Sequence, residues 1–197
     1  NGTGKMVENS ESKPRTLVFD IETNGLWAEV TEFHVGVIYC IEEKKYEVYR
    51  TADSMVEALN EGTLLVGHNW LGYDSVVLNK LSILDIRHDI PIIDTLILGK
   101  LVDYDKDKSF KFSLEAYGAR LGFPKGEYSD WAVYTPEMEA YCIQDVKVTT
   151  KLLKSLRRRS RWLPKEALEL EQEVQRVITQ QYITGWKFDV GEAERLH

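Results

Sequence analysis

The sequence contains few cysteines, no long apolar run and no repeats, and each shortage excludes a class of protein. Its two cysteines, Cys40 and Cys142, are too few for a disulfide-stabilised scaffold, and they are not spaced as a metal-binding motif. No apolar run approaches the roughly 18 residues that a membrane-spanning helix needs. These features predict a protein of the reducing cytoplasm without a membrane partner.

Positive charge is also scarce, because 25 lysines and arginines stand against 32 aspartates and glutamates, for a formal net charge of -7. This balance is unlike the basic surface of a typical DNA-binding protein, although net charge does not decide what one site binds. A nuclease with a carboxylate cluster can be acidic overall. The 43% hydrophobic and 29% charged content predicts one globular domain. Residues 1–15 are polar and are expected to be a disordered leader or an artificial extension.

Apolar patterning predicts an α/β domain with a mixed sheet. Strand-like runs occur at residues 17–21, 33–41, 46–50, 64–68 and 90–94, and the first three suggest an antiparallel meander. Helical patterns follow at residues 53–62, from 72 onward, and at 95–101, 112–122, 135–159 and 164–184. Strands followed by alternating helices and strands are typical of a sheet flanked by helices.

Four acids interrupt these apolar elements. Asp20 and Glu22 lie two apart in a strand and share one face with Val18, whereas Asp74 lies in the first turn of a helix and Asp145 inside a long helix. Like charges about 4 Å apart repel by roughly 4 kcal/mol at an effective dielectric of 20, so converging carboxylates need cations. Oxygen ligands suit Mg²⁺ or Mn²⁺, and a pair of such ions is a known device for displacement at phosphorus.

Three motifs carry a family resemblance. "FDIET", "HNWLGYD" and "YCIQD", in that order, resemble the exonuclease motifs of the DEDD superfamily in its tyrosine-containing branch. With "KGEYSDW" and "ITGWKFDV", the chain is similar to the proofreading domain of a family A DNA polymerase, most of all to those of short-tailed phages. The resemblance implies a ribonuclease H-like fold, with a mixed five-stranded sheet flanked by helices.

The resemblance also implies roles for five residues. Asp20, Glu22 and Asp145 match the ligands of a first divalent cation, with Asp20 bridging to a second cation that Asp74 supports. Tyr141 matches the residue that orients the attacking water. The implied reaction is two-metal hydrolysis at a single-stranded or frayed DNA 3′ end, which releases nucleoside monophosphates.

Three further residues match positions that contact the terminal nucleotide. Thr23 and Leu26 follow the first motif, and Asn69 belongs to the second, although "HNWLGYD" departs in length from the motif of bacterial repair polymerases. The resemblance places the exonuclease domain at residues 16–185 and the start of a connection to a missing polymerase portion at 186–197. It leaves any processivity partner open, and a phage protein of this kind belongs to the host-cell cytoplasm.

Two other functions remain as alternatives. A stand-alone RNA-trimming exonuclease would carry the same acids and tyrosine, but "ITGWKFDV" resembles the segment that leads into a polymerase portion. A catalytically silent scaffold is the other alternative, and the intact acids argue against it.

Several polar residues have simpler structural explanations. Asp94 stands where a helix N-cap belongs, and His68 and His88 lack ligand spacing, so packing or exposure is expected for both. The arginines of 157–161 suit a helix C-terminus for dipole reasons, and the segment 100–111 is expected to be a surface loop. DNA contact is the alternative for both segments.

Overall fold

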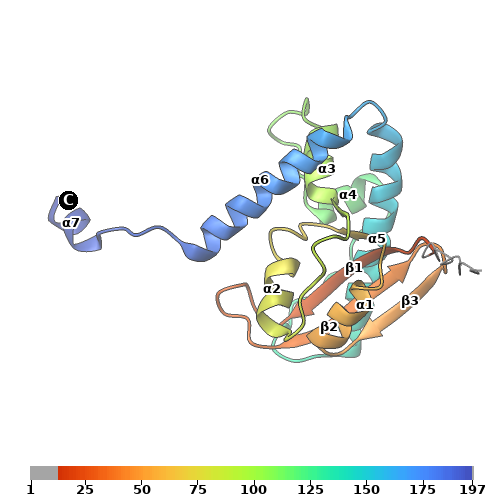
Figure 1. Cartoon of the computed structure of the whole chain (residues 1–197), viewed down its shortest axis with the longest axis horizontal. Helices are drawn as coiled ribbons and strands as arrows, with labels where there is room; N and C mark the ends of the chain where they lie inside the picture. The colour runs from red at the N-terminus through yellow and green to blue at the C-terminus, as the bar shows by residue number, and fades with distance from the viewer. Residues whose placement is uncertain (1–12, 197) are drawn as a thin grey trace, which may run out of the picture.

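The structure is a computed structural model that describes residues 13–196, so most of the expected leader at 1–15 lies outside the described residues. Figure 1 shows the arrangement of its helices and strands. The five strands are β1 (Thr16–Thr23), β2 (Phe33–Cys40), β3 (Lys45–Tyr49), β4 (Leu64–Gly67) and β5 (Ile92–Asp94). The helices are α1 (Ala52–Leu59), α2 (Asp74–Leu81), α3 (Thr95–Val102), α4 (Leu114–Arg120), α5 (Pro136–Arg159), α6 (Lys165–Thr184) and α7 (Val190–Leu196).

The strands form one mixed sheet in the order β3-β2-β1-β4-β5. β1, β2 and β3 pair antiparallel, as the short turns between them require, whereas β4 and β5 join as parallel strands after helical crossovers. The predicted five-stranded mixed sheet with an antiparallel meander is therefore confirmed. β1 lies at its centre, between β2 and β4.

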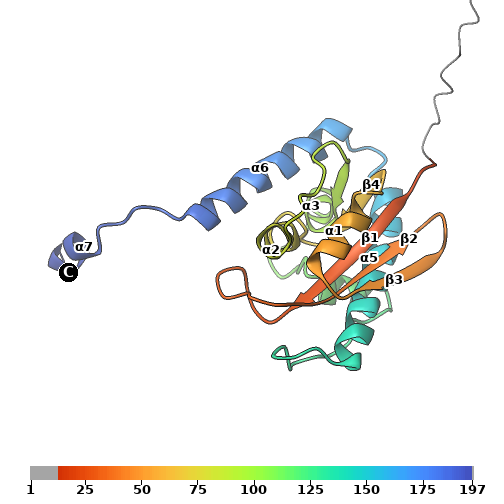
Figure 2. The ribbon, with the colours of Figure 1, turned by 60° about the horizontal axis from the view of Figure 1, so that its bottom comes forward.

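The side chains of β1 alternate between two helical layers. Leu17, Phe19 and Ile21 pack in one core cluster with buried residues of α1 and α2. Val18 faces the opposite side, in a second cluster with the buried face of α5. Figure 2 shows α1 and α5 on opposite faces of the sheet. Because Asp20 and Glu22 share the face of Val18, they point toward the α5 side.

α5 begins and ends where the sequence predicts. The Thr135 hydroxyl caps the helix by accepting a hydrogen bond from the Met138 backbone N–H, and Pro136 occupies the first turn, where its missing N–H costs nothing. Its other face packs with α3 and α4 in a third apolar cluster. α5 therefore packs against both the sheet and the helices α3 and α4. Its Asp145 side chain lies between them and is 2% exposed.

Two helices differ from the sequence-based expectation. The apolar pattern of residues 73–84 predicts a longer helix, but α2 ends at Leu81, where the Asp53 carboxylate accepts hydrogen bonds from the Ser82 hydroxyl at 2.7 Å and the Ile83 N–H at 2.8 Å. The short helix α7 was not expected. None of the helices in the described range 13–196 has both the length and the apolar character to cross a membrane.

Candidate active site

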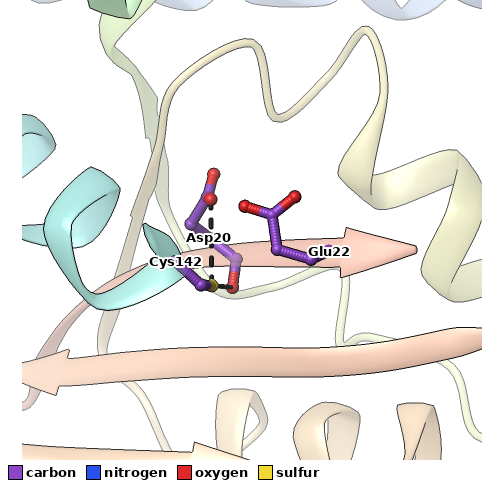
Figure 3. Close-up of side chains that lie close together, drawn as sticks. All are labelled: Asp20, Glu22 and Cys142. Carbon is purple, nitrogen blue, oxygen red and sulfur yellow. Dashed lines mark hydrogen bonds between the residues drawn. The ribbon is translucent and has the colours of Figure 1, made fainter. Parts of the chain in front are cut away.

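β1 presents two carboxylates on one face near its C-terminal end. Figure 3 shows the side chains of Asp20 and Glu22 projecting from the same side of the strand. The register between β1 and β2 shifts between Glu22 and Thr23, so a β-bulge directly follows the second acid. Bulges redirect side chains at the end of a ladder. The strand thus delivers both carboxylates into the space beside α5, as the alternation predicts.

The structure brings all four predicted acids together. Asp74 at the first position of α2 and Asp145 in α5 line the same cavity of about 400 Å³ as Asp20 and Glu22. Asp74 and Asp145 are buried, and the two acids of β1 are half-buried. Residues up to 125 positions apart in sequence therefore meet at the C-terminal end of the central strand.

Burial raises the pKa of every carboxyl group in this cavity. The pKa of Glu22 rises to about 8 through desolvation and the neighbouring acids, and the pKa of Asp74 also rises to about 8, chiefly through desolvation. The pKa of Asp145 rises to about 6, and that of Asp20 rises well above its ordinary value. Close carboxylates resist ionising together, so the site favours any bound cation that neutralises them.

The oxygen atoms of this cluster fit a divalent cation. Within the described residues, the Asp145 Oδ1 atom is buried and has no hydrogen-bond partner, which is costly for a carboxylate. Ligand atoms of Asp20 and Glu22, with the sulfur of Cys142, all lie within 4.8 Å of one another. A cation that reached both Asp145 Oδ1 and the Asp20 and Glu22 carboxylates would give the unpartnered atom a partner and offset the repulsion.

Cys142 supports Asp20 from α5. Its Sγ lies 3.4 Å from the Asp20 backbone oxygen and 3.9 Å from Asp20 Oδ2. Figure 3 marks both contacts with dashed lines. Burial and the surrounding acids hold the thiol pKa well above its ordinary value, so the group stays protonated and donates its hydrogen. The contact places Cys142 directly beside Asp20, on the α5 side of the acidic cavity. The sequence spacing gave no sign of this contact.

Lys125 is the basic group of the site and received no role from the sequence. Its ammonium lies 2.5 Å from Asp145 Oδ2 and 4.7 Å from the centroid of the Tyr141 ring. Lys125 also lines the acidic cavity. The lysine belongs to the "KGEYSDW" segment, 20 residues before its partner, so only the folded loop reveals the pairing.

Tyr141 lies one helical turn before Asp145 on α5. It contacts an aromatic group in the preceding loop, with ring centroids 5.9 Å from Tyr128 and 5.5 Å from Trp131. Burial raises its pKa, so the phenol stays protonated at neutral pH. The ring borders the site through its contact with Lys125 and is not among the residues that line the acidic cavity.

A second cavity of about 340 Å³ adjoins the acids. Thr23 and Leu26 line it together with Glu22, Tyr73 and Trp131. Leu26 is 73% exposed and offers its side chain to the cavity, whereas the buried Thr23 hydroxyl bonds to the Gly25 carbonyl at 3.0 Å. Thr23 and Leu26, the predicted nucleotide-contacting residues, thus lie beside the acids, and the Thr23 hydroxyl also stabilises the loop after β1.

Asn69 lines the acidic cavity from a left-handed backbone conformation, with φ of 62°. Its N–H and that of Leu71 donate to the Asp94 carboxylate at 3.1 and 3.0 Å. The same carboxylate caps α3 by accepting from the Leu96 N–H at 2.9 Å. The predicted N-cap role of Asp94 is confirmed, and the residue also fixes the turn before Asp74.

Two further residues, Tyr73 and His68, received no site role from the sequence. The Tyr73 hydroxyl donates to the Gly25 carbonyl at 2.7 Å, and so joins α2 to the loop after β1. His68, expected to be packed or exposed, lines the acidic cavity; its Nδ1 lies 3.0 Å from the Thr95 hydroxyl, and burial lowers its pKa to about 4. His88 is exposed, which is one of the two environments expected for it.

One arginine of the basic segment 157–161, at the end of α5, forms a structural ion pair. Arg159 pairs with the buried Asp103 at 2.6 Å, and the Tyr117 hydroxyl donates to the same carboxylate at 3.1 Å. The segment 100–111 is therefore anchored to α5 at Asp103, while the other arginines of 157–161 are exposed.

Sequence comparison relates the chain to phage DNA polymerases. It is 31% identical to the DNA-directed DNA polymerases of Enterobacteria phage T3 and Escherichia phage T7 over 242 aligned positions, which cover 92% of this chain and 34% of each relative. The chain thus spans about a third of the length of these curated relatives. No family model matches the chain.

Structure comparison relates the chain to nucleases. NrnC of Brucella melitensis with bound Mg²⁺ has a TM-score of 0.68 at 20% identity, with 94% of both chains covered. Exonuclease I of E. coli in complex with a dT13 oligonucleotide has a TM-score of 0.55 at 14% identity, covering 77% of this chain and 42% of that one. The chain therefore has a ribonuclease H-like fold and is related in sequence to one part of phage DNA polymerases, as its motifs predict.

Proposed function

We propose that this chain is a metal-dependent 3′–5′ exonuclease that shortens single-stranded or frayed DNA, as the proofreading part of a DNA-directed DNA polymerase. The meeting of Asp20, Glu22, Asp74 and Asp145 in one cavity carries the proposal. The relationship to two phage DNA polymerases supports DNA as the substrate. Because those relatives are about three times as long, polymerase activity and a polymerase portion as partner belong to the same proposal.

Two divalent cations, Mg²⁺ or Mn²⁺, are the proposed cofactors. Asp20, Glu22 and Asp145 would hold one, and Asp20 with Asp74 would hold the other. The all-oxygen donor set and the unpartnered Asp145 Oδ1 support this assignment. When bound, the cations offset charge on the scissile phosphodiester and activate the attacking water.

The protein residues position the reactants. Tyr141 orients the attacking water from α5, and Thr23, Leu26 and Asn69 hold the terminal nucleotide beside the acids. The water oxygen forms a bond to phosphorus, the bond from phosphorus to the 3′ oxygen breaks, and that oxygen takes up a proton. The products are a nucleoside 5′-monophosphate and a strand shorter by one nucleotide.

The exonuclease domain comprises residues 16–185 in this proposal. α6 ends at Thr184, and Gly185 follows with φ of 70°, which suits a change of direction at that point. Residues 186–197 would begin the connection to the polymerase portion. The host-cell cytoplasm, where a phage DNA polymerase acts, is the proposed location.

A stand-alone exonuclease on short oligonucleotides is the second function. The specific observation in its favour is that the chain and NrnC cover 94% of each other, and that one NrnC structure is described as bound to pGG. This function uses the same acids and differs in the substrate.

The test is digestion of 5′-labelled single-stranded DNA and RNA of matched sequence, with Mg²⁺ or Mn²⁺ and with chelator. We expect a ladder that shortens one nucleotide at a time from the 3′ end of DNA, slower digestion of RNA, and no digestion in chelator. Asp145→Asn serves as the inactive control.

Each other result contradicts part of the proposal. Faster RNA digestion would assign the chain to the RNA-trimming alternative. Absence of cleavage with either metal would indicate a silent scaffold. Internal fragments in place of a ladder would mean endonuclease activity.

A further inference from the structure

Two further cavities continue from the active site along α6. The first, of about 540 Å³, lies between the loop after β1 and the C-terminal half of α6 and includes Leu26, Trp27 and Tyr182 in its lining. The second, of about 400 Å³, includes Trp27, Lys80 and Arg176. We call these two cavities together the α6 groove. Figures 1 and 2 show α6 crossing above α2 in both views.

The α6 groove adjoins the acidic cavity. Asn69 and Tyr73 line both the acidic cavity and the first cavity of the groove. Leu26 is shared with the cavity that holds Thr23, and Trp27 is shared between the two cavities of the groove. A strand that leaves the acids can therefore follow one path from Tyr73 past Leu26 to Trp27.

The charge of the groove differs from that of the protein as a whole. In a chain of net charge -7, none of the residues lining the two cavities, all within the described range, is an aspartate or glutamate. Lys80 and Arg176 lie at the far end. Arg176 pairs with the exposed Glu173 at 3.2 Å, and Lys80 Nζ donates to the Trp27 carbonyl at 2.9 Å. The lining thus contributes two positive charges and no negative charge to the groove, which favours a polyanion.

Apolar and aromatic groups are exposed along the same path. Tyr182 is 74% exposed and Leu26 is 73% exposed, so both are open to a ligand. Lys80 lies 5.0 Å from the centroid of the Trp27 ring. Aromatic rings near cations are a combination that binds single-stranded nucleic acid, because bases stack on the rings and phosphates meet the charges.

The wall formed by α6 is fixed in place. The Gln172 side chain accepts from the Asp94 N–H at 2.8 Å and donates to the Ile92 carbonyl at 3.1 Å. The Thr179 hydroxyl donates to the Leu71 carbonyl at 2.9 Å. These bonds tie α6 to β5 and to the turn before α2, so the groove exists before any ligand binds.

We infer that the α6 groove binds the nucleotides of single-stranded DNA that lie 5′ of the one being removed, with bases against Tyr182 and Trp27 and phosphates near Arg176 and Lys80. This inference rests on the proposed exonuclease function. It predicts that affinity rises with substrate length until the groove is filled and stays constant beyond that length.

The test compares KM and kcat for thymidine oligonucleotides from the dinucleotide upward, in the wild-type chain and in Arg176→Gln and Tyr182→Ala. Both substituted residues have exposed side chains, so the variants are expected to fold, and their melting temperatures check this. Loss of one stacked base corresponds to about 1–3 kcal/mol, so Tyr182→Ala should raise KM for long substrates by about fivefold or more. KM for the dinucleotide should stay unchanged.

A salt titration adds a second readout. Each phosphate contact to a single strand contributes about 0.7 to the slope of log affinity against log salt, so Arg176→Gln should lower that slope by about 0.7. Lys154→Gln, which removes a positive charge from the exposed surface of α5 away from the groove, is the matched control and should change neither the slope nor KM.

The outcomes separate the two hypotheses. If the wild-type chain degrades neither the dinucleotide nor longer oligonucleotides, the proposed function fails. If it degrades both but Arg176→Gln and Tyr182→Ala retain wild-type KM at every length, the groove does not bind DNA, and the inference is wrong. Equal losses in Lys154→Gln would likewise overturn it, because overall charge would then explain the effect.

Discussion

At the scale of single residues, the site consists of buried acids that repel one another when they are ionised. The pKa of Glu22 and of Asp74 rises to about 8, mainly because burial disfavours their charged forms. Such groups reduce the stability of the metal-free fold and become favourable only when a cation binds. The presence of these acids in a central strand and a buried helix turn is therefore explained by function and not by folding stability.

Asp74→Asn separates these two effects. We expect it to lower exonuclease activity by more than the roughly 10–100-fold that loss of an outer-shell group costs, because a proposed metal ligand is removed. The same change relieves repulsion, so the melting temperature in chelator should equal or exceed that of the wild-type chain. Turnover assays and thermal melts check both points, and near-normal turnover would refute the ligand role of Asp74.

Lys125→Met tests whether the ammonium competes with cations. Lys125 pairs with Asp145 at 2.5 Å and shares the acidic cavity, so in the metal-free state it neutralises a proposed ligand. Without it, we expect Mn²⁺ to bind several-fold tighter in calorimetry and the metal-free protein to melt at a lower temperature. Weaker Mn²⁺ binding would show instead that Lys125 helps to hold the metal. Lys154→Gln is the control for charge alone.

At the scale of secondary structure, the turn between β4 and α2 positions Asp74 and Asn69. Asp94 fixes that turn from the end of β5 by accepting two of its backbone N–H groups while it caps α3. Tyr73 then connects the same turn to the loop after β1. The proposed metal site and the proposed nucleotide site are thus supported by a shared set of hydrogen bonds.

Asp94→Ala should damage both stability and activity from outside the acidic cavity. The cap and two backbone donors lose their partner, so we expect a loss of about 3 kcal/mol in the free energy of unfolding. Activity should fall further than the unfolded fraction explains, since Asn69 moves. Denaturant titration and turnover at low temperature measure these effects. Asp89→Ala removes only a surface pair with Arg87 and should change little.

At the scale of the whole molecule, the aligned part of each phage polymerase is longer than this chain. The alignment has 242 positions against 197 residues, so the relatives carry segments within it that this chain lacks. The fold described here is therefore a compact version of that region. Its sheet, with α5 on one face and α1 and α2 on the other, brings the four acids together at the C-terminal end of β1.

The acid cluster should make the free energy of unfolding depend on pH. Glu22, Asp74 and Asp145 have folded-state pKa values of about 8, 8 and 6, which lie above their ordinary values. Between the ordinary and raised values the folded protein binds more protons than the unfolded chain, so its stability falls as pH rises. In chelator, the melting temperature should therefore decrease from about pH 5 to about pH 8.

Added Mg²⁺ should reverse this decrease near pH 8, because it binds the ionised carboxylates of the folded state. Asp74→Asn should show a flatter pH profile in chelator. A melting temperature that rises with pH over the same interval, without metal, would contradict the raised pKa values.

The sequence by itself determined the parts that follow from local periodicity and capping. Strand alternation placed Asp20 and Glu22 on the face opposite Leu17 and Phe19, and the order of strands and helices predicted the mixed sheet. The helical patterns at 135–159 and 164–184 match α5 and α6 to within one residue, because capping and backbone conformation are local properties.

Only the tertiary structure decided which distant residues join the site. Lys125, Tyr73 and Cys142 gave no periodic or spacing signal, since their contacts depend on how loops and α5 pack against β1. The α6 groove likewise exists only because hydrogen bonds across 78 and 108 positions hold α6 beside the turn before α2. Such contacts depend on the global packing of the chain, which no local pattern encodes.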